Sequence, residues 1–267
     1  MKKFFAQAYL WILLILLYAP ILIIVIFSFT ESKVLGNWTG FSFGLYQNIL
    51  SGKVGMSFLK ALENTVSIGI LSAIISTFMG SISAIGIYNM RGKKRKAIMF
   101  LNDIPMLNPD IITGVSLFLL FVAFSIPQGY LTVLLAHVSF CTPYVILCVL
   151  PKLRQMDPNL YEAALDLGAT PRQALNKVIF PQIKPAMISG FILAFTLSID
   201  DFAVTLFTKG NKGFENLSTY IYADAHKGGL TPELRPIMSM IFVFVLLLLI
   251  IINIRSSRNH KKQEIRI

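Results

Sequence analysis

Several ionisable side chains lie inside stretches of this sequence that are otherwise apolar. They are one histidine and five acids: Glu63, Asp103, Asp110, His137, Asp200 and Asp201. A charged aspartate near the centre of a membrane helix costs about 2.5–3.5 kcal/mol on insertion scales, so such groups are expected to have a function. No Lys or Arg lies in the same runs. The carboxylates therefore favour a cationic ligand and would repel an anion such as sulfate or molybdate.

Each of these groups also has a structural interpretation. Asp103 suits a helix cap or a salt bridge, and Asp110 follows a proline and could cap a broken helix. Asp200 and Asp201 point about 100° apart on a regular helix, so both cannot face one ligand, and one of them could bond a partner chain. His137 suits a polar contact between helices better than a proton relay, and no ligand cluster accompanies it to hold zinc.

The elements that must position these groups follow from composition. The chain has 267 residues, of which 55% are hydrophobic and 14% are charged, too apolar for an ordinary soluble domain. The apolar residues gather in runs close to the ~20 residues that a helix needs to cross a bilayer, and helices satisfy their own backbone hydrogen bonds in lipid. We predict an all-α integral membrane protein, a single domain over 1–267. The six predicted spans cover about 8–29, 64–90, 97–125, 130–150, 185–207 and 236–254.

The basic residues predict the orientation of the spans. With the N-terminus inside, 17 of the 24 Lys and Arg residues fall on the cytoplasmic side, which agrees with the positive-inside rule. Both termini are therefore expected in the cytoplasm, in a multi-pass protein of a bacterial plasma (inner) membrane. The net charge of +11 reflects this topology, since the basic clusters are short and adjoin spans, and no nucleic-acid partner is expected. The first run is too long for a typical signal peptide and is interpreted as a retained span.

One polar segment, about 157–184, interrupts the apolar chain between the fourth and fifth spans. An aspartate followed by proline starts a predicted helix over 158–167, and Gly168 supplies the left-handed position that ends it. Thr170 begins a second short helix. Pro181 and Pro185 are expected to break the chain before the fifth span. The segment is thus predicted to form two short helices joined by a tight bend.

The segment "EAALDLGATPRQALNKVIFP" resembles the cytoplasmic EAA loop of permease subunits in binding-protein-dependent ABC importers. The family pattern is E-A-A, three residues, G, nine residues, I, one residue, L-P. Val178 stands in the Ile position and Phe180 in the Leu position, apolar for apolar. The positions that match are Glu162, Ala163, Ala164, Gly168 and Pro181. The resemblance implies the type I ABC importer permease fold.

In that family the loop carries a coupling helix that docks on a separate ATPase subunit. No G-x-x-x-x-G-K-[ST] occurs in this sequence, as expected if ATP is bound and hydrolysed elsewhere. The resemblance thus implies ATP-binding ABC subunits, two copies of them, and an extracytoplasmic binding protein as partners. No catalytic residue, metal site or cofactor is expected in this chain.

Two further stretches, "PMLNPDIITGVSL" and "LSIDDFAVTLF", resemble the permease subunits of spermidine/putrescine importers. Carried over position by position, that resemblance places Asp110, Ser198, Asp200 and Asp201 on a substrate path for polyamines, in a hetero-pair with a second permease. Another cargo, such as iron or a different organic cation, remains an alternative on the same architecture. A secondary transporter or membrane enzyme is disfavoured by the EAA segment and by the lack of a nucleophile–base constellation.

Overall fold

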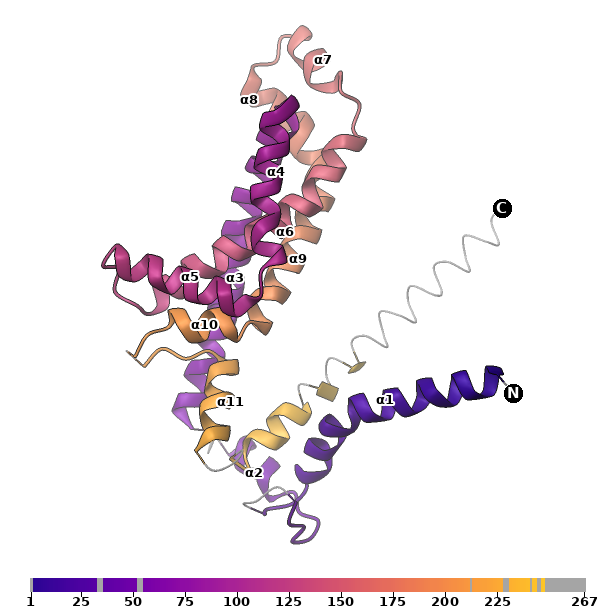
Figure 1. The fold of residues 1–267 in the computed structure, drawn as a ribbon, viewed down its shortest axis with the longest axis vertical. Coiled ribbons are helices and arrows are strands. Elements are labelled where there is room, and N and C mark those ends of the chain that lie inside the picture. The colour runs from indigo at the N-terminus through magenta and orange to yellow at the C-terminus, as the bar shows by residue number, and fades with distance from the viewer. Residues whose placement is uncertain are drawn as a thin grey trace. The chain divides into compact units, whose positions relative to one another are not determined.

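In the described part of the structure, a computed structural model, all regular secondary structure is helical (Figure 1). The structure describes residues 2–32, 36–51, 55–211, 213–227, 231–240, 242–243 and 246–247. The chain divides into two compact units, one formed by residues 1–56 with 221–267 and the other by residues 57–220. Helix α11 (Leu217–His226) crosses the boundary between them.

The first unit contains the N-terminal helix α1 (Lys2–Phe27) and the short helix α2 (Gly44–Leu50). Helix α1 confirms a helix over most of the first predicted span. Its end is tied to α2 by a hydrogen bond of 2.7 Å between the Ser28 and Tyr46 hydroxyls. About half of the sixth predicted span, 236–254, lies outside the described residues.

Three long helices, α3 (Met56–Asn89), α6 (Tyr130–Gln155) and α9 (Phe180–Asp200), form the shaft of the second unit. Small residues let them approach closely, as is usual between membrane helices. Val145 of α6 is the clearest case, because it packs against glycines on both neighbours. A Cβ added at Gly80 of α3 would lie 2.7 Å from Val145, and one at Gly190 of α9 would lie 3.2 Å from it.

The run over 97–125, predicted as one span, is broken into two helices by a sharp bend. The chain forms α4 (Gly92–Leu107) and α5 (Asp110–Ala123), which meet at a bend of 108°. Pro109 lacks a backbone N–H, and it holds Asn108 in an extended conformation, φ −78° and ψ 140°, as expected for the residue before proline. The corner is visible in Figure 1, where α5 turns away from the shaft.

The polar segment between α6 and α9 forms a separate short helix near its start and a helix continuous with α9 at its end. It contains α7 (Leu160–Asp166) and α8 (Pro171–Ala174), and a wide π-helical turn, η1 (Leu175–Ile179), joins α8 directly to α9. The prediction that Pro181 and Pro185 break the chain was wrong, since both lie within α9. A proline ring clashes with the carbonyl four residues earlier. For Pro181 that residue is Lys177, which lies in the wider π turn.

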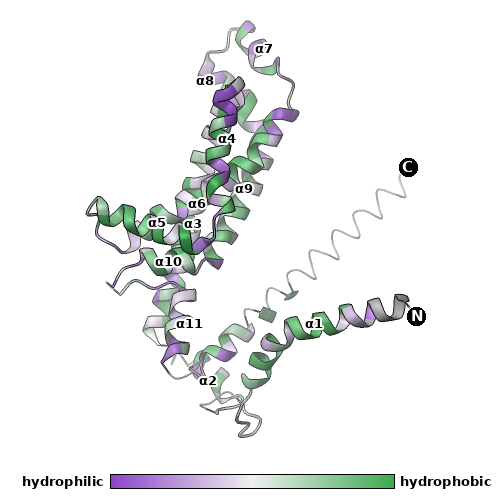
Figure 2. Cartoon of the chain, viewed as in Figure 1, coloured by the Kyte–Doolittle hydropathy of each residue, from purple (hydrophilic) through white to green (hydrophobic). Residues whose placement is uncertain are grey.

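Four helices of the described chain are long and apolar enough to cross a membrane, and the bent pair α4–α5 raises this to five if it counts as one span. The four are Tyr9–Phe27, Met56–Asn89, Tyr130–Gln155 and Pro171–Asp200. Figure 2 shows the corresponding contrast within the second unit, with hydrophobic helix shafts and hydrophilic residues at the start of α4 and around α7 and α8. The protein is therefore a multi-pass helical membrane protein.

Candidate functional site

The break between α9 and α10 (Ala203–Thr208) is built around the carboxylate of Asp201. One oxygen accepts the backbone N–H of Val204 at 3.1 Å, and the other accepts the backbone N–H and the hydroxyl of Thr205 at 2.8 and 2.7 Å. Asp201 is only 9% exposed, so a charge that would be costly in apolar surroundings is satisfied by these donors. Its side chain thus caps the first turn of α10 from one residue before the backbone N-cap position, Phe202.

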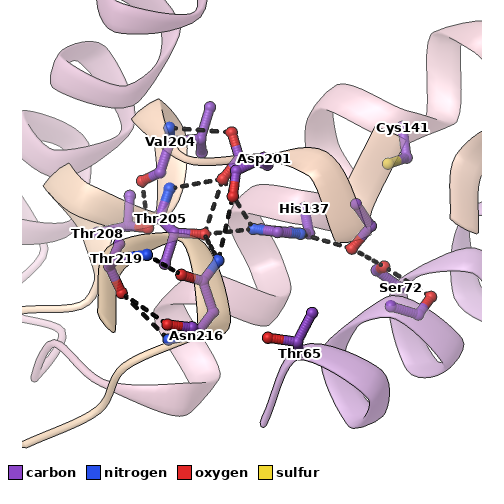
Figure 3. Close-up of polar contacts among 12 residues, drawn as sticks. Thr65, Ser72, His137, Cys141, Asp201, Val204, Thr205, Thr208, Asn216 and Thr219 are labelled. Atoms are coloured by element: carbon purple, nitrogen blue, oxygen red, sulfur yellow. Dashed lines mark hydrogen bonds and ion pairs between the residues drawn. The ribbon is translucent and has the colours of Figure 1, made fainter. Parts of the chain in front are cut away.

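His137 of α6 joins this cap to α3 and α9 (Figure 3). Its Nε2 lies 2.9 Å from the Thr205 hydroxyl and 3.3 Å from Asp201 Oδ2, and its Nδ1 lies 2.6 Å from the Ser198 hydroxyl. The Ser72 hydroxyl on α3 donates in turn to Ser198 at 2.9 Å. His137 is 1% exposed. The predicted role of His137 as a polar contact between helices is confirmed.

The hydrogen bonds of this network can be placed in one order from α3 to Asp201. Ser72 donates to Ser198, and the Ser198 hydroxyl can then donate to His137 Nδ1. A proton on Nε2 can be donated to the Thr205 oxygen, because the Thr205 hydroxyl donates its own proton to Asp201. Each hydroxyl donates once in this order, and the two ring nitrogens of His137 connect Ser198 to Thr205.

A second layer of contacts closes the network from the segment after α10. The Asn216 amide donates to the backbone carbonyl of Asp201 at 3.1 Å and to the Thr205 hydroxyl at 3.2 Å. Asn216 and Thr219 cap one another through paired backbone and side-chain bonds, and the next residue, Leu217, donates its N–H to Thr65 of α3 at 2.7 Å. The break after Asp200 is thus held by buried, reciprocal hydrogen bonds that pre-organise it.

Two of the predicted acids lie outside this network and are exposed. Asp110 begins α5, and Asp200 ends α9. Helix α5 packs closely against the start of α10, because a Cβ at Gly114 would lie 3.2 Å from the Ala203 carbonyl oxygen and from Val204 Cα. Asp110 stands about one helical turn before Gly114, and Asp200 stands three residues before Ala203. Asp110 and Asp200 thus stand within a few residues of this contact, which we call the α5–α10 corner.

The structure separates the four predicted substrate-path residues into two pairs. Ser198, 2% exposed, and Asp201 are buried within the network, whereas Asp110 and Asp200 are exposed. The expectation that adjacent Asp200 and Asp201 face different directions is confirmed. Sequence reasoning missed three residues of this network. Ser72 and Thr205 are ordinary polar residues within apolar runs, and Asn216 lies in the loop after the fifth run. The sequence did hold a signal for Thr205. An aspartate just before a helix is a start signal, and the residues of the following first turn, Thr205 among them, are the ones that its carboxylate bonds.

The residues that matched the EAA pattern lie at the other end of α6 and α9. Glu162, Ala163 and Ala164 are in α7, which begins at Leu160 rather than at the predicted position 158. The start shifts because Asp157 accepts the N–H of Asn159 at 2.9 Å in a local turn that leaves Asn159 as the cap. Pro181 is on α9, one residue after its start.

Gly168 ends α7 in the left-handed conformation that its position predicted. Its φ is +84°. Its N–H bonds to the Leu165 carbonyl and the Ala169 N–H to the Ala164 carbonyl, which is the Schellman pattern. Thr170 then caps α8 in a reciprocal capping box with Gln173, as predicted for the second start signal.

These features define a helical membrane protein with a rigid polar module at one end of its shaft and exposed acids at the other. His137 and Met156 lie near opposite ends of α6, about 28 Å apart along the helix. Comparison with known proteins identifies the class. Residues 76–260 match the family described as "Binding-protein-dependent transport system inner membrane component", and the chain belongs to this family. It is thus a permease component of an ABC importer, whose ATP hydrolysis takes place on a separate subunit.

Curated relatives narrow the family further. The chain is 35% identical to the spermidine/putrescine transport system permease protein PotC of Haemophilus influenzae, over 91% of this chain and 93% of that protein. It is 37% identical to the putrescine transport system permease protein PotI of Escherichia coli K12, over 84% of this chain and 81% of that protein.

A solved structure supports the fold. A bacterial ABC transporter that imports the acidic polysaccharide alginate has a chain that superposes with a TM-score of 0.68, at 15% identity, over 96% of this chain and 95% of that one. At this identity the likeness concerns the fold alone.

Proposed function

We propose that this permease carries polyamines such as spermidine and putrescine, with the exposed acids of the α5–α10 corner on the path. The observation that carries the proposal is that Asp110 and Asp200 are both exposed and stand within a few residues of the contact between α5 and α10. Relatives at 35% and 37% identity bear the names of spermidine/putrescine and putrescine permeases, which agrees with a cationic cargo.

Polyamine chemistry suits this corner. A polyamine presents ammonium groups separated by short methylene chains, so it needs spaced carboxylates and apolar or aromatic walls. Phe207 packs against Gly114 at the corner itself, and Phe202 follows the Asp200–Asp201 pair in sequence. A few exposed acids bind such a ligand weakly enough for release on the other side, which a closed cage would prevent.

Ser198 and Asp201 contribute to the path in a different way. Their side chains are engaged within the chain, so we assign them the positioning of the α9–α10 break that presents Asp200. Loss of this network would move Asp200 and the start of α10 together, because Asp201 follows Asp200 in the chain and its carboxylate binds the first turn of α10.

We also propose that α7 is the coupling helix that docks on the ATPase subunits. The support for this proposal is the exposure of residues in and just after α7. Glu162 and Ala163 are exposed, and Leu167 is 90% exposed although it is a large apolar residue in a polar module. Docking into a cleft of another subunit would cover Leu167. The Gly168 bend and the continuous α8–η1–α9 helix would transmit motion of α7 to the end that carries Asp200.

We further propose six spans with both termini in the cytoplasm. We also propose assembly with two ATPase subunits, a homologous second permease and an extracytoplasmic binding protein. Orientation is tested with single cysteines at Asn48 and Gly168 in a chain whose Cys141 and Cys148 are replaced by alanine. An impermeant thiol reagent added to intact cells should label position 48 only. Labelling of position 168 from outside would contradict the orientation.

The cargo is tested by reconstituting the permease with its ATPase, partner permease and binding protein in proteoliposomes. Uptake of labelled spermidine and putrescine should require ATP and should compete with unlabelled polyamines. Molybdate and sulfate should not compete. Uptake of ferric iron or another organic cation, with no uptake of polyamines, would keep the permease class and refute the polyamine cargo.

A further inference from the structure

A charged cavity of about 690 Å³ lies beside α7, at the end of the shaft away from the acids. It is lined by the ends of α3 and α6, the start of α4 and part of α7. Two guanidinium groups, Arg91 and Arg95, and two carboxylates, Asp157 and Glu162, line it together. Among the described residues none of these four groups forms an ion pair. A cavity with balanced and unpaired charges suits a ligand that carries both signs.

An apolar groove adjoins this cavity. The groove has a volume of about 420 Å³ and is lined on α3 by Gly86 and Ile87, and on α4 by Ile98 and Leu101. Met90 lines both the cavity and the groove, so the two spaces meet at that side chain. Polar space therefore continues into apolar space at the end of two membrane helices.

From this juxtaposition we propose a binding site for an aminophospholipid such as phosphatidylethanolamine. Its phosphate binds Arg91 and Arg95 through charge-assisted hydrogen bonds, and its ammonium group binds Asp157 and Glu162. One acyl chain lies in the apolar groove beyond Met90. Basic pockets between membrane helices at the cytoplasmic surface are suited to lipid headgroups, and here the carboxylates add a preference for an amine.

The position of this site gives it a consequence for coupling. Glu162 belongs to α7 and Arg95 to α4, so a bound headgroup bridges the helix proposed to contact the ATPase and the helix that leads to the α5–α10 corner. The headgroup would hold α7 against the shaft by contacts that the chain alone does not make. Lipid binding itself is independent of the cargo, so its test does not depend on the polyamine proposal.

The test is a lipid titration of the purified, delipidated full chain in detergent, followed by native mass spectrometry. Phosphatidylethanolamine should form a saturable first adduct at lower concentration than phosphatidylglycerol, which lacks the ammonium, or phosphatidylcholine, whose quaternary amine has no N–H donor. The double variant Arg91→Gln/Arg95→Gln should raise the half-saturating phosphatidylethanolamine concentration about tenfold.

Two matched variants separate this site from general attraction of lipid. Lys93→Gln/Lys94→Gln removes the same charge from the same turn of α4, at exposed residues outside the cavity lining, and should change binding less than about twofold. Asp157→Asn keeps an acceptor for its local turn but removes the negative charge. It should weaken phosphatidylethanolamine and leave phosphatidylglycerol unaffected or tighter.

Equal losses in the lysine and arginine double variants would overturn the proposal, as would unchanged binding in the arginine variant. The cavity could instead receive part of the ATPase subunit. If Arg91→Gln/Arg95→Gln leaves lipid binding intact but weakens assembly with that subunit, the site belongs to the subunit interface and the lipid assignment is wrong.

Discussion

Replacing Asp201 or its neighbour Asp200 by asparagine should separate a structural role from a role in transport. The Asp201 carboxylate accepts three hydrogen bonds from Val204 and Thr205 within a buried site. An asparagine has one oxygen, so its NH₂ group must face a backbone N–H. One buried donor is then left without an acceptor, which costs about 1–3 kcal/mol. We expect Asp201→Asn to lower the free energy of unfolding by about 2 kcal/mol.

The matched control is Asp200→Asn. Asp200 is exposed, and within the described chain its carboxylate accepts no hydrogen bond, so its replacement should change the free energy of unfolding by less than about 0.5 kcal/mol. For a chain of this size 2 kcal/mol corresponds to a fall in Tm of about 4–8 °C.

The assay is thermal unfolding in detergent, followed by a fluorophore that reacts with thiols as they become exposed. Cys141 is buried and Cys148 is partly buried, so both report loss of the shaft. A Tm for Asp201→Asn within 1 °C of the unsubstituted chain, or an equal fall for Asp200→Asn, would refute the assignment of Asp201 as the cap of α10.

Two other substitutions test the module and the packing of the shaft. Gly168→Val places a β-branched residue at φ +84°, which is strongly disfavoured. ATP-driven uptake should therefore fall at least tenfold, while the amount of protein in the membrane stays normal. Normal uptake would remove the support for a rigid coupling bend. Gly80→Ala puts a methyl group 2.7 Å from Val145 and should cost about 1–3 kcal/mol in thermal unfolding. Gly86→Ala, where the space is open, should be neutral or stabilise by up to about 1 kcal/mol, and equal Tm values for the two variants would contradict the packing.

Features set by neighbouring residues were predictable from the sequence. The Gly168 stop, the Thr170 cap and the divergence of Asp200 from Asp201 depend on bonds within a few residues, and all three are present. The interhelical contact of His137 was also predicted, because an unpaired imidazole in an apolar run needs a partner.

Features that depend on the angle between helices, or on contacts between residues far apart in sequence, were not predictable. The apolar run over 97–125 is continuous in hydropathy; a break beside Asp110 was open as an alternative, but the 108° direction of the bend was not predictable. The clash of Pro181 with the preceding turn is relieved by a π turn, and sequence patterns do not distinguish that from a break. The burial of Ser198 and Asp201 follows from Ser72 and His137, which come from two other helices.

The central claim is that exposed carboxylates at the α5–α10 corner carry a cation. It is tested most directly by the initial rate of spermidine uptake into proteoliposomes that contain the complete importer with Asp200→Asn or Asp110→Asn. Loss of one charge contact worth about 1.4 kcal/mol predicts a fall of about tenfold, with Tm unchanged and partial recovery in Asp200→Glu. Spermidine and putrescine uptake at the unsubstituted rate in both asparagine variants would contradict the claim.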